Sequence, residues 1–234
     1  MIPVTGAGVA RAGENPVVVE LSTPQSCYSC PPAEQYLGEL SARPGVVALE
    51  WHVDYWDTLV YGFHGKWKDP FSSPEHTRRQ PVYNVSICKR SGVYTPQMAI
   101  AGHIEETGTR DTVINTHIGR LKSQPKLTVA ISGGPRPKVT VTGNAGAGSE
   151  VLLVQFINEA VTRVPSGENH GKTLKSHHIV QDMSKLAEWR GTDAGFNLPA
   201  DAIGDNRGCA VLVQERNQGR IIGADLCPNG AGIS

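Results

Sequence analysis

The chain has no excess of charge of either sign and no long apolar run. It carries 22 lysine and arginine residues against 22 aspartate and glutamate residues in a length of 234. A protein that binds nucleic acids non-specifically normally has a basic surplus or a basic stripe. A membrane-spanning helix needs roughly 20 consecutive apolar residues, and no run approaches that length. Neither nucleic-acid binding nor a membrane span is therefore indicated.

The chain also has little cysteine, and its start shows no apolar stretch typical of a signal peptide over residues 1–14. Five cysteines is an odd number, so at least one thiol is free or pairs with another molecule. Stable disulfides would favour an exported protein. The sequence leaves the compartment open: periplasmic or secreted if a signal peptide has been removed, and otherwise cytoplasmic. It also leaves the oligomeric state open.

The first part of the chain has the pattern of a β-α-β unit. Val17 to Leu21 and Val46 to Val53 are short apolar runs typical of buried parallel strands. Between them, Ala33 to Ala42 places leucines on one side and glutamates and a glutamine on the other, and it stops at Pro44-Gly45. This pattern predicts an amphipathic helix that crosses between two parallel strands, a connection that is nearly always right-handed.

An aromatic-rich insertion follows at residues 54–92. Its second half has helical character that we expect Pro81 to break. Gln97 to Ala101 then predicts a further strand, and Thr109 to Leu121 a helix with a threonine cap. Together these elements predict an α/β domain over residues 15–122.

Beyond Ser123 the pattern becomes alternating and rich in turns, which is typical of antiparallel strands. The predicted strands are Lys126 to Ser132, Lys138 to Thr142, Val151 to Ile157, Cys209 to Val213 and Arg220 to Leu226. We expect a smaller β-rich, sandwich-like domain over residues 125–228, with the boundary near Pro125.

Two cysteines flank the hairpin that the last two strands predict. If Arg216 faces Arg220 across it, then Cys209 faces Cys227. Facing residues at non-hydrogen-bonded positions of antiparallel strands have Cα atoms about 4.5 Å apart, which is within reach of a disulfide. We expect this pair to be bonded or adjacent and Cys88 to be the odd thiol.

The strongest chemical signal is the Cys-x-x-Cys segment Cys27–Cys30, at the junction of a predicted strand and a predicted helix. A helix amino terminus favours the thiolate, which is the nucleophile. Cys27 ends a polar loop, so we expect it to be solvent-accessible and reactive, with Cys30 resolving the mixed disulfide. Because Pro31 and Pro32 follow, we expect the helix to begin at the prolines, which would weaken this stabilisation.

Other interpretations of the cysteine pair stay open. The pair could be a structural disulfide in a domain that only binds a ligand. Paired thiolates at this spacing also select Cu(I), with His52 or Met98 as a third ligand. Zinc is disfavoured because no second Cys-x-x-Cys or paired histidine spacing completes four ligands.

His52 and Asp54 are candidate catalytic residues at the end of the second predicted strand. Ligand sites of parallel sheets gather at the carboxyl ends of strands. The two residues have the same strand parity, so either could move a proton for Cys27 or Cys30. Alternatively, they and Asp57 are polar groups that tie the aromatic insertion to the strand.

Several longer motifs are distinctive. They are Val17 to Leu21, Cys30-Pro31-Pro32-Ala33, Trp51 to Asp57, Trp67 to Phe71, Tyr94 to Met98 and Gly167 to Asn169. With them the chain resembles, over most of its length, a mostly bacterial thioredoxin-like family known as domain of unknown function 1223. The resemblance implies a thioredoxin-like domain followed by a β-rich one, and it implies no activity. Members commonly carry export signals, and Ser22 and Tyr28 differ from the residues expected there.

The thioredoxin-like resemblance adds the segment around Pro96 to the site. That fold keeps a cis peptide bond against its active-site cysteines, so we expect Thr95-Pro96 to be cis, although few X–Pro bonds are. Gln97 would bind a substrate backbone, because that edge of the fold accepts extended peptides by strand addition. Thr95 and Tyr28 complete the predicted substrate-binding residues.

The leading functional hypothesis is a thiol–disulfide oxidoreductase that cycles Cys27 and Cys30 against a protein or a small-molecule thiol or disulfide. No cofactor is expected for this chemistry. The Cu(I)-binding protein and the redox-inactive ligand-binding domain are the alternatives.

Overall fold

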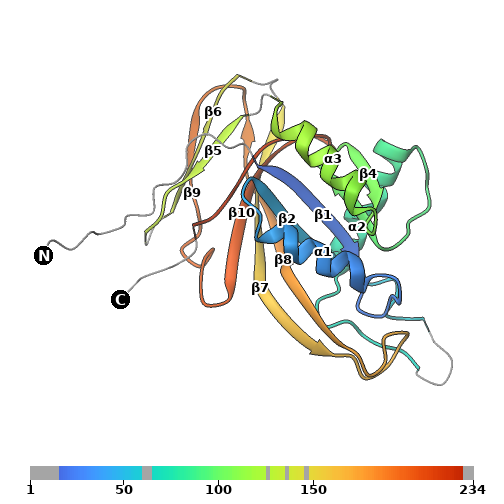
Figure 1. Cartoon of the computed structure of the whole chain (residues 1–234). Coiled ribbons are helices and arrows are strands. Elements are labelled where there is room, and N and C mark those ends of the chain that lie inside the picture. Colours follow the sequence, from blue (N-terminus) through green and yellow to red (C-terminus); the bar gives the residue numbers. More distant parts are fainter. Residues whose placement is uncertain (1–15, 60–64, 125–126, 135–136, 145–147, 229–234) are drawn as a thin grey trace, which may run out of the picture.

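A computed structural model describes residues 16–59, 65–124, 127–134, 137–144 and 148–228 (Figure 1). The helices are α1 (Pro31–Ser41), α2 (Pro74–Tyr83), the π-helical turn η2 (Asn84–Cys88) and α3 (Asp111–Lys122). The strands are β1 (Val17–Thr23), β2 (Val46–His52), β3 (Gln97–Ile100), β4 (Ile104–Thr107), β5 (Thr128–Ile131), β6 (Lys138–Thr142), β7 (Ser149–Arg163), β8 (Thr173–Trp189), β9 (Ala194–Asn197), β10 (Arg207–Glu215) and β11 (Ile221–Leu226).

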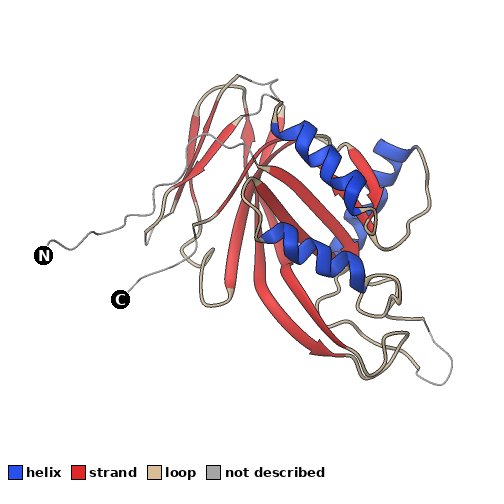
Figure 2. Cartoon of the chain, viewed as in Figure 1, coloured by secondary structure: helices blue, strands red, loops and turns tan. Residues whose placement is uncertain are grey.

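In the described part of the chain these strands form two sheets, which are drawn in red in Figure 2. The larger is an eight-stranded mixed sheet in the order β11-β10-β7-β8-β2-β1-β3-β4. β1 and β2 are parallel, as predicted, and β3 runs antiparallel to β1. The smaller is a three-stranded antiparallel sheet in the order β5-β6-β9. The protein is therefore a mixed α/β fold with a second, small antiparallel sheet.

The β1–β2 part of the large sheet is covered on both faces. On one face, alternate residues such as Val19 and Ala48 pack with the apolar sides of α1 and α3. On the other face, Val18 and Trp51 pack with residues of β7, β10 and β11. The sheet curls, since the Ile221 N–H donates to the Ala101 carbonyl at 2.9 Å and thereby brings β11 beside β1. Strands buried on both faces explain the continuous apolar runs of β1 and β2.

The C-terminal half is sandwich-like in part. A third apolar cluster lies between the small sheet and strands β7, β8 and β10, with Val139, Leu153 and Trp189 among its buried side chains. However, β7, β8, β10 and β11 continue the sheet that contains β1 and β2. The expected domain boundary near Pro125 lies outside the described residues, and the division into two domains stays a prediction.

Two sequence-based expectations about the middle of the chain differ from the structure. Pro81 does not break the predicted helix, because α2 runs through it to Tyr83 and continues into η2. Ser73 caps α2 by accepting the Glu75 N–H, and the buried Arg79 and Tyr83 anchor the helix on the sheet. Tertiary contacts thus outweigh the local cost of the proline.

The long strand β8 is also absent from the sequence-based expectations. Residues 181–185 of β8 are all exposed, so the segment lacks the alternation that predicts a half-buried strand. Its pairing with β7 over nearly its whole length forms it instead.

The predicted hairpin disulfide is confirmed. Cys209 and Cys227 are bonded with their Cα atoms 5.1 Å apart. Ala210 pairs with Leu226, which is the register predicted at the cysteines, and the Cys227 N–H donates to the Cys209 carbonyl at 2.8 Å. Nearer the turn the register shifts by one between Val213 and Gln214, so Arg216 does not face Arg220 as expected. Cys88 is the free cysteine, also as expected.

Removing this disulfide should lower the stability of the protein. The bond closes a loop with a sequence separation of 18, for which we expect a loss of about 3 kcal/mol in the free energy of unfolding in the Cys209→Ser, Cys227→Ser double variant. Urea unfolding without reductant measures it, and Cys88→Ser is the matched control. Equal stability of the double variant and the parent would contradict the assignment.

Candidate functional site

The Cys27–Cys30 pair forms a disulfide between the end of β1 and the start of α1. The two Cα atoms are 5.4 Å apart. The loop is a series of tight turns, in which the Cys27 N–H donates to the Pro24 carbonyl and the Cys30 N–H to the Cys27 carbonyl. α1 begins at Pro31, as predicted, with Cys30 as its N-cap. Cys30 nevertheless has helical angles, with φ −82° and ψ −34°.

The prediction that Cys27 is solvent-accessible is wrong. Both cysteines are completely buried, whereas Tyr28 between them has 69% of its surface exposed. The cover comes from residues 164–172, the connection between β7 and β8, which lies against the cysteine loop. We call this connection the hairpin tip.

Asn169 holds the hairpin tip on the cysteine loop. Its side chain is fully buried, and its amide donates to the Gln25 carbonyl at 2.8 Å and to the Cys27 carbonyl at 2.9 Å. Gly167 makes the close approach possible: its φ is +79°, and a Cβ there would lie 3.2 Å from the Ser26 Cβ. Two backbone acceptors of the buried loop are thus satisfied by one side chain that is distant in sequence.

The exposed side of the motif carries charges from the same tip. The Tyr28 N–H donates to Glu168 Oε2 at 2.7 Å. The ammonium of Lys172 lies 4.8 Å from the centre of the Tyr28 ring and donates to Asn169 Oδ1 at 2.9 Å. The ring is therefore held between the motif and a cation, an arrangement that contributes modestly to stability at an exposed position.

A cluster of buried ionisable groups lies between α1 and the sheet, close behind the motif. His52 Nδ1 lies 2.6 Å from Asp69 Oδ2, and His52 Nε2 lies 2.9 Å from Glu50 Oε1. Glu34, one turn after Cys30 in α1, accepts a hydrogen bond of 2.6 Å from the Thr23 hydroxyl. All four ionisable residues are at most 2% exposed. We call Glu34, Glu50, His52 and Asp69 the acid–imidazole cluster.

Burial and neighbouring charges shift the pKa values in this cluster strongly. Burial, and then the Glu50 carboxylate, raise the pKa of Glu34 to about 8. Burial alone would lower the pKa of His52, but Asp69 and Glu50 together raise it well above its ordinary value. Burial opposes ionisation of Asp69, yet His52 keeps its pKa below the ordinary value. Near neutral pH the cluster therefore holds a protonated Glu34 beside an imidazolium–carboxylate pair.

The structure brings His52 close to the motif, but through carboxylates. Both ring nitrogens of His52 bind acids rather than sulfur, so its proposed proton transfer to the cysteines stays a prediction. Asp54 turns to α2, where its Oδ1 accepts from the Thr77 hydroxyl at 2.5 Å. Asp57 accepts from the Ser72 hydroxyl at 2.6 Å. These contacts of Asp54 and Asp57 agree with the alternative that they tie the insertion to the strand.

The predicted cis bond at Thr95-Pro96 is confirmed. A Cβ on Gly108 would lie 2.9 Å from the Ala33 Cβ and 3.2 Å from the Pro96 Cβ. Since Ala33 is in the first turn of α1, Pro96 lies beside the end of the helix that carries Cys30. Thr95 is half-buried, and its role in substrate binding stays a prediction.

Gln97 does not lie at a free strand edge, so that expectation is wrong. β3 pairs with β1 on one side and with β4 on the other. The Gln97 side chain is 3% exposed; its amide donates to Asn84 Oδ1 at 2.5 Å and its carbonyl accepts from Gln80 at 2.8 Å. Strand addition at β3 therefore has no open backbone to use.

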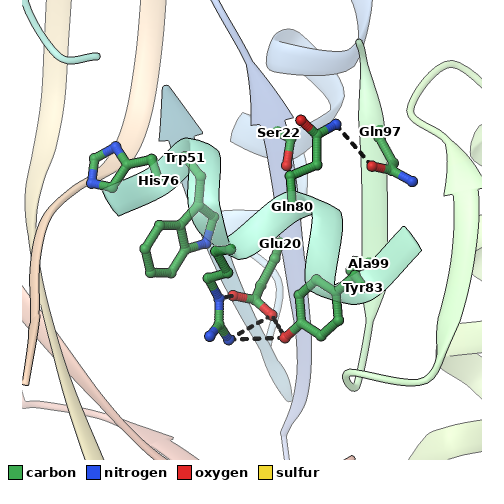
Figure 3. Close-up of a pocket in the computed structure, with 9 residues that line it drawn as sticks. Glu20, Ser22, Trp51, His76, Gln80, Tyr83, Gln97 and Ala99 are labelled. Carbon is green, nitrogen blue, oxygen red and sulfur yellow. Dashed lines mark hydrogen bonds and ion pairs between the residues drawn. The ribbon is translucent and has the colours of Figure 1, made fainter. Parts of the chain in front are cut away.

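A second buried polar cluster lies on the opposite face of the sheet, beneath α2 (Figure 3). Arg79 Nε is 2.7 Å from Glu20 Oε1, and the Tyr83 hydroxyl also donates to Glu20. The Arg79 guanidinium lies 5.0 Å from the Trp51 ring. The cavity among these groups is about 10 Å³, which is about enough for one water molecule. This cluster anchors α2 and leaves no room for a substrate.

The described residues show three further features of the molecule. Within the residues that the structure describes, no group of three or more histidine, cysteine, aspartate or glutamate side chains is arranged to hold a metal ion. Met98, the possible third Cu(I) ligand, is fully buried in the apolar core beside α1 and α3. No helix among the described residues is both long and apolar enough to span a bilayer.

Fold and site define a mixed α/β protein whose Cys-x-x-Cys disulfide stands at the amino end of a helix. The chain belongs to the family described as "Protein of unknown function (DUF1223)", whose sequence model matches residues 18–214. A crystal structure of a protein from Agrobacterium tumefaciens is similar at 30% identity, with a TM-score of 0.77, over 95% of this chain and 99% of that one. HBP35 of Porphyromonas gingivalis is similar in fold alone, at 12% identity and a TM-score of 0.58, over 95% of this chain and 79% of that one. No curated protein matches the sequence.

Sequence reasoning did not assign roles to several residues of the site. Asn169 belongs to a motif that carries the family resemblance, and this motif was the available signal. Glu34 lies on the side of α1 that the sequence pattern reads as polar and exposed, but it is buried. Glu50 is a charged residue within the apolar run Val46 to Val53. A charged residue in a buried strand normally has a buried partner, and this was the available signal.

Asn169→Ala should loosen the cover over the motif. Two buried carbonyls would lose their donor, which costs roughly 1–3 kcal/mol, and we expect Cys27 of the reduced protein to react about tenfold faster with iodoacetamide, since looser covering raises access. Mass spectrometry of the alkylated protein measures the rate. Asn206→Ala is the control, because Asn206 binds the Glu159 carbonyl in β7 at an exposed place. An unchanged alkylation rate would show that the tip does not control access.

Glu34→Gln should change how stability depends on pH. The pKa of Glu34 is raised from 4.5 to about 8, so its contribution is fully present below pH 4.5 and lost as the pH rises through 8. The raised pKa of His52 acts in the same direction. As the pH rises from about 5 to about 8, the free energy of unfolding of the parent should fall by on the order of a few kcal/mol more than that of the variant. Urea unfolding across this range measures it, with the exposed Glu39→Gln as control; parallel curves for parent and Glu34→Gln would contradict the shift.

Proposed function

We propose that the protein is a thiol–disulfide oxidoreductase of thioredoxin-like type, with Cys27 and Cys30 as its redox pair. The observation that carries the proposal is the placement of this disulfide at the amino end of α1, one turn before a buried acid that is protonated near neutral pH. The cis bond before Pro96, beside the first turn of α1, supports the thioredoxin-like assignment.

The chemistry needs only sulfur, protons and a dithiol partner. A substrate thiolate attacks Cys27 Sγ, the Cys27–Cys30 bond breaks, and Cys30 leaves as a thiolate that takes up a proton. A second substrate thiolate then attacks the substrate sulfur of the mixed disulfide and releases Cys27 as a thiolate. The substrate loses two electrons and becomes a disulfide while the protein becomes a dithiol, and the reverse sequence reduces a disulfide.

Glu34 is the proton donor and acceptor in this proposal. Its backbone N–H donates to the Cys30 carbonyl at 3.1 Å, so the carboxyl and the thiol belong to the same first turn of α1. With a pKa of about 8, the acid can protonate a Cys30 thiolate on reduction and take the proton back on oxidation, because a group acts best near its own pKa. Burial and then the Glu50 carboxylate raise that pKa, whereas His52 and Asp69 make smaller contributions of opposite sign.

One observation favours a second candidate. Both cysteines are completely buried, which also suits a structural disulfide in a ligand-binding domain. The redox potential separates the two candidates: a value near or above about −270 mV supports catalysis, and one below about −300 mV supports a structural bond.

Cysteine variants test the roles in the cycle. Cys27→Ser should abolish reduction of a protein disulfide, whereas Cys30→Ser should accumulate a mixed disulfide through Cys27, because the resolving thiol is missing. Non-reducing electrophoresis and mass spectrometry identify the adduct, with Cys88→Ser as the control. A mixed disulfide that forms only through Cys30 would reverse the roles, and no exchange in any protein would favour the structural disulfide.

A further inference from the structure

A groove of about 470 Å³ runs along α1 from the cysteine motif. One wall is α1 over residues 31–39, which begin directly after Cys30. The other wall is the start of β8 over residues 173–177, which begin directly after Lys172 at the Tyr28 ring. Both walls therefore start at the motif. In Figure 1 the β7–β8 hairpin reaches past the amino end of α1, at the same end of the molecule.

The wall formed by β8 presents an open strand edge. β7 pairs with β8 along this segment in a regular register, whereas β2 pairs with β8 at one position, Glu50 with Ile179. The His177 N–H points away from β7, because it donates to Glu50 Oε2 at 2.9 Å. Backbone groups alternate in direction along an antiparallel strand. The backbone N–H and C=O groups of Thr173 and Lys175, two residues that line the groove, therefore also point away from β7.

The opposite wall and the charges suit a polar, extended occupant. Gly38 lies against the His177 ring: a Cβ there would be 2.6 Å from its Cδ2, which closes that end of the groove. Glu39 on α1 lines one wall, and Lys175 on β8, whose ammonium is paired with Glu159 Oε2 at 2.7 Å, lines the other. An open strand edge binds an extended polypeptide through main-chain hydrogen bonds. Residues 173–177 span about 13 Å, which is the length of about four residues of an extended chain.

We propose that this groove binds an extended, cysteine-containing polypeptide segment by strand addition to β8 and directs its sulfur to the Cys27–Cys30 pair. The proposal rests on the proposed oxidoreductase function and adds the substrate class. α1 lies beside this edge and restricts further strand pairing there, as natural proteins do with strand edges they do not cover completely.

Lys175→Pro tests the strand edge directly. Proline removes the N–H that points into the groove, and it is tolerated where that N–H makes no bond within the sheet. The probe is a labelled six-residue extended peptide with serine in place of cysteine, and fluorescence anisotropy measures its binding. We expect the affinity of Lys175→Pro for this peptide to fall about tenfold. Lys175→Ala keeps the N–H and should stay within about twofold of the parent. Gln35→Trp fills the groove from α1, and a similar loss there excludes a folding defect of the proline variant as the cause.

Turnover of disulfides keeps this proposal separate from the proposed function. Two substrates are compared: the cysteine peptide as a mixed disulfide with thionitrobenzoate, and dithiobis-nitrobenzoate, which carries no peptide. In Lys175→Pro we expect kcat/KM for the peptide substrate to fall about tenfold relative to kcat/KM for dithiobis-nitrobenzoate, in line with the loss of binding. Equal peptide affinity in the parent, Lys175→Pro and Gln35→Trp would overturn the groove. Parallel losses for the peptide and for glutathione disulfide would assign the edge to small cysteine peptides as well as to proteins. A parent that binds the peptide but reduces neither disulfide would overturn the oxidoreductase function instead.

Discussion

The buried ion pair of His52 and Asp69 joins the parts from which the site is built. Asp69 Oδ2 receives both the His52 imidazole at 2.6 Å and the Gln25 N–H at 2.8 Å, so one oxygen links β2 to the cysteine loop. Its other oxygen accepts the Phe71 N–H and orders the middle of the aromatic insertion. An unpaired charge in this dry place would be strongly unfavourable. The pair therefore fixes the insertion, the strand and the loop relative to one another.

The cysteine motif is buried, but the segment that covers it is held by few contacts. The cysteines sit below a cover made by the hairpin tip, and the tip is held by a few hydrogen bonds of Asn169 and Glu168 and by one cation over an aromatic ring. Such contacts are weaker in sum than the apolar packing of the β-α-β unit beneath. A rigid base with a lightly held cover is typical of sites whose local opening costs less than global unfolding.

The sequence predicted the parts of the fold that local patterns determine. β1, α1, β2 and α3 follow from apolar runs and helical periodicity, although the expected threonine cap of α3 is replaced by Arg110. The bond between Cys209 and Cys227 follows from the hairpin that the two cysteines flank. What could not be predicted depends on contacts between distant segments. β8 forms because β7 pairs with it, and α2 continues through Pro81 because Arg79 is anchored on the sheet. The cover over Cys27, and thus its burial, comes from residues about 140 positions away, and no local pattern near the motif reports it.

The cysteine loop is synthesised well before the segment that covers it. Asn169 reaches the Cys27 carbonyl across 142 positions of sequence, and synthesis proceeds at about 5–20 residues per second with amino-terminal parts folding first. The nascent β-α-β unit therefore displays its two thiols for many seconds before the segment that hides them has left the ribosome. An oxidant or an isomerase meets the pair freely in this interval, whereas afterwards it must wait for the cover to open. The redox state of the mature protein can thus be set by the environment in which its chain is completed.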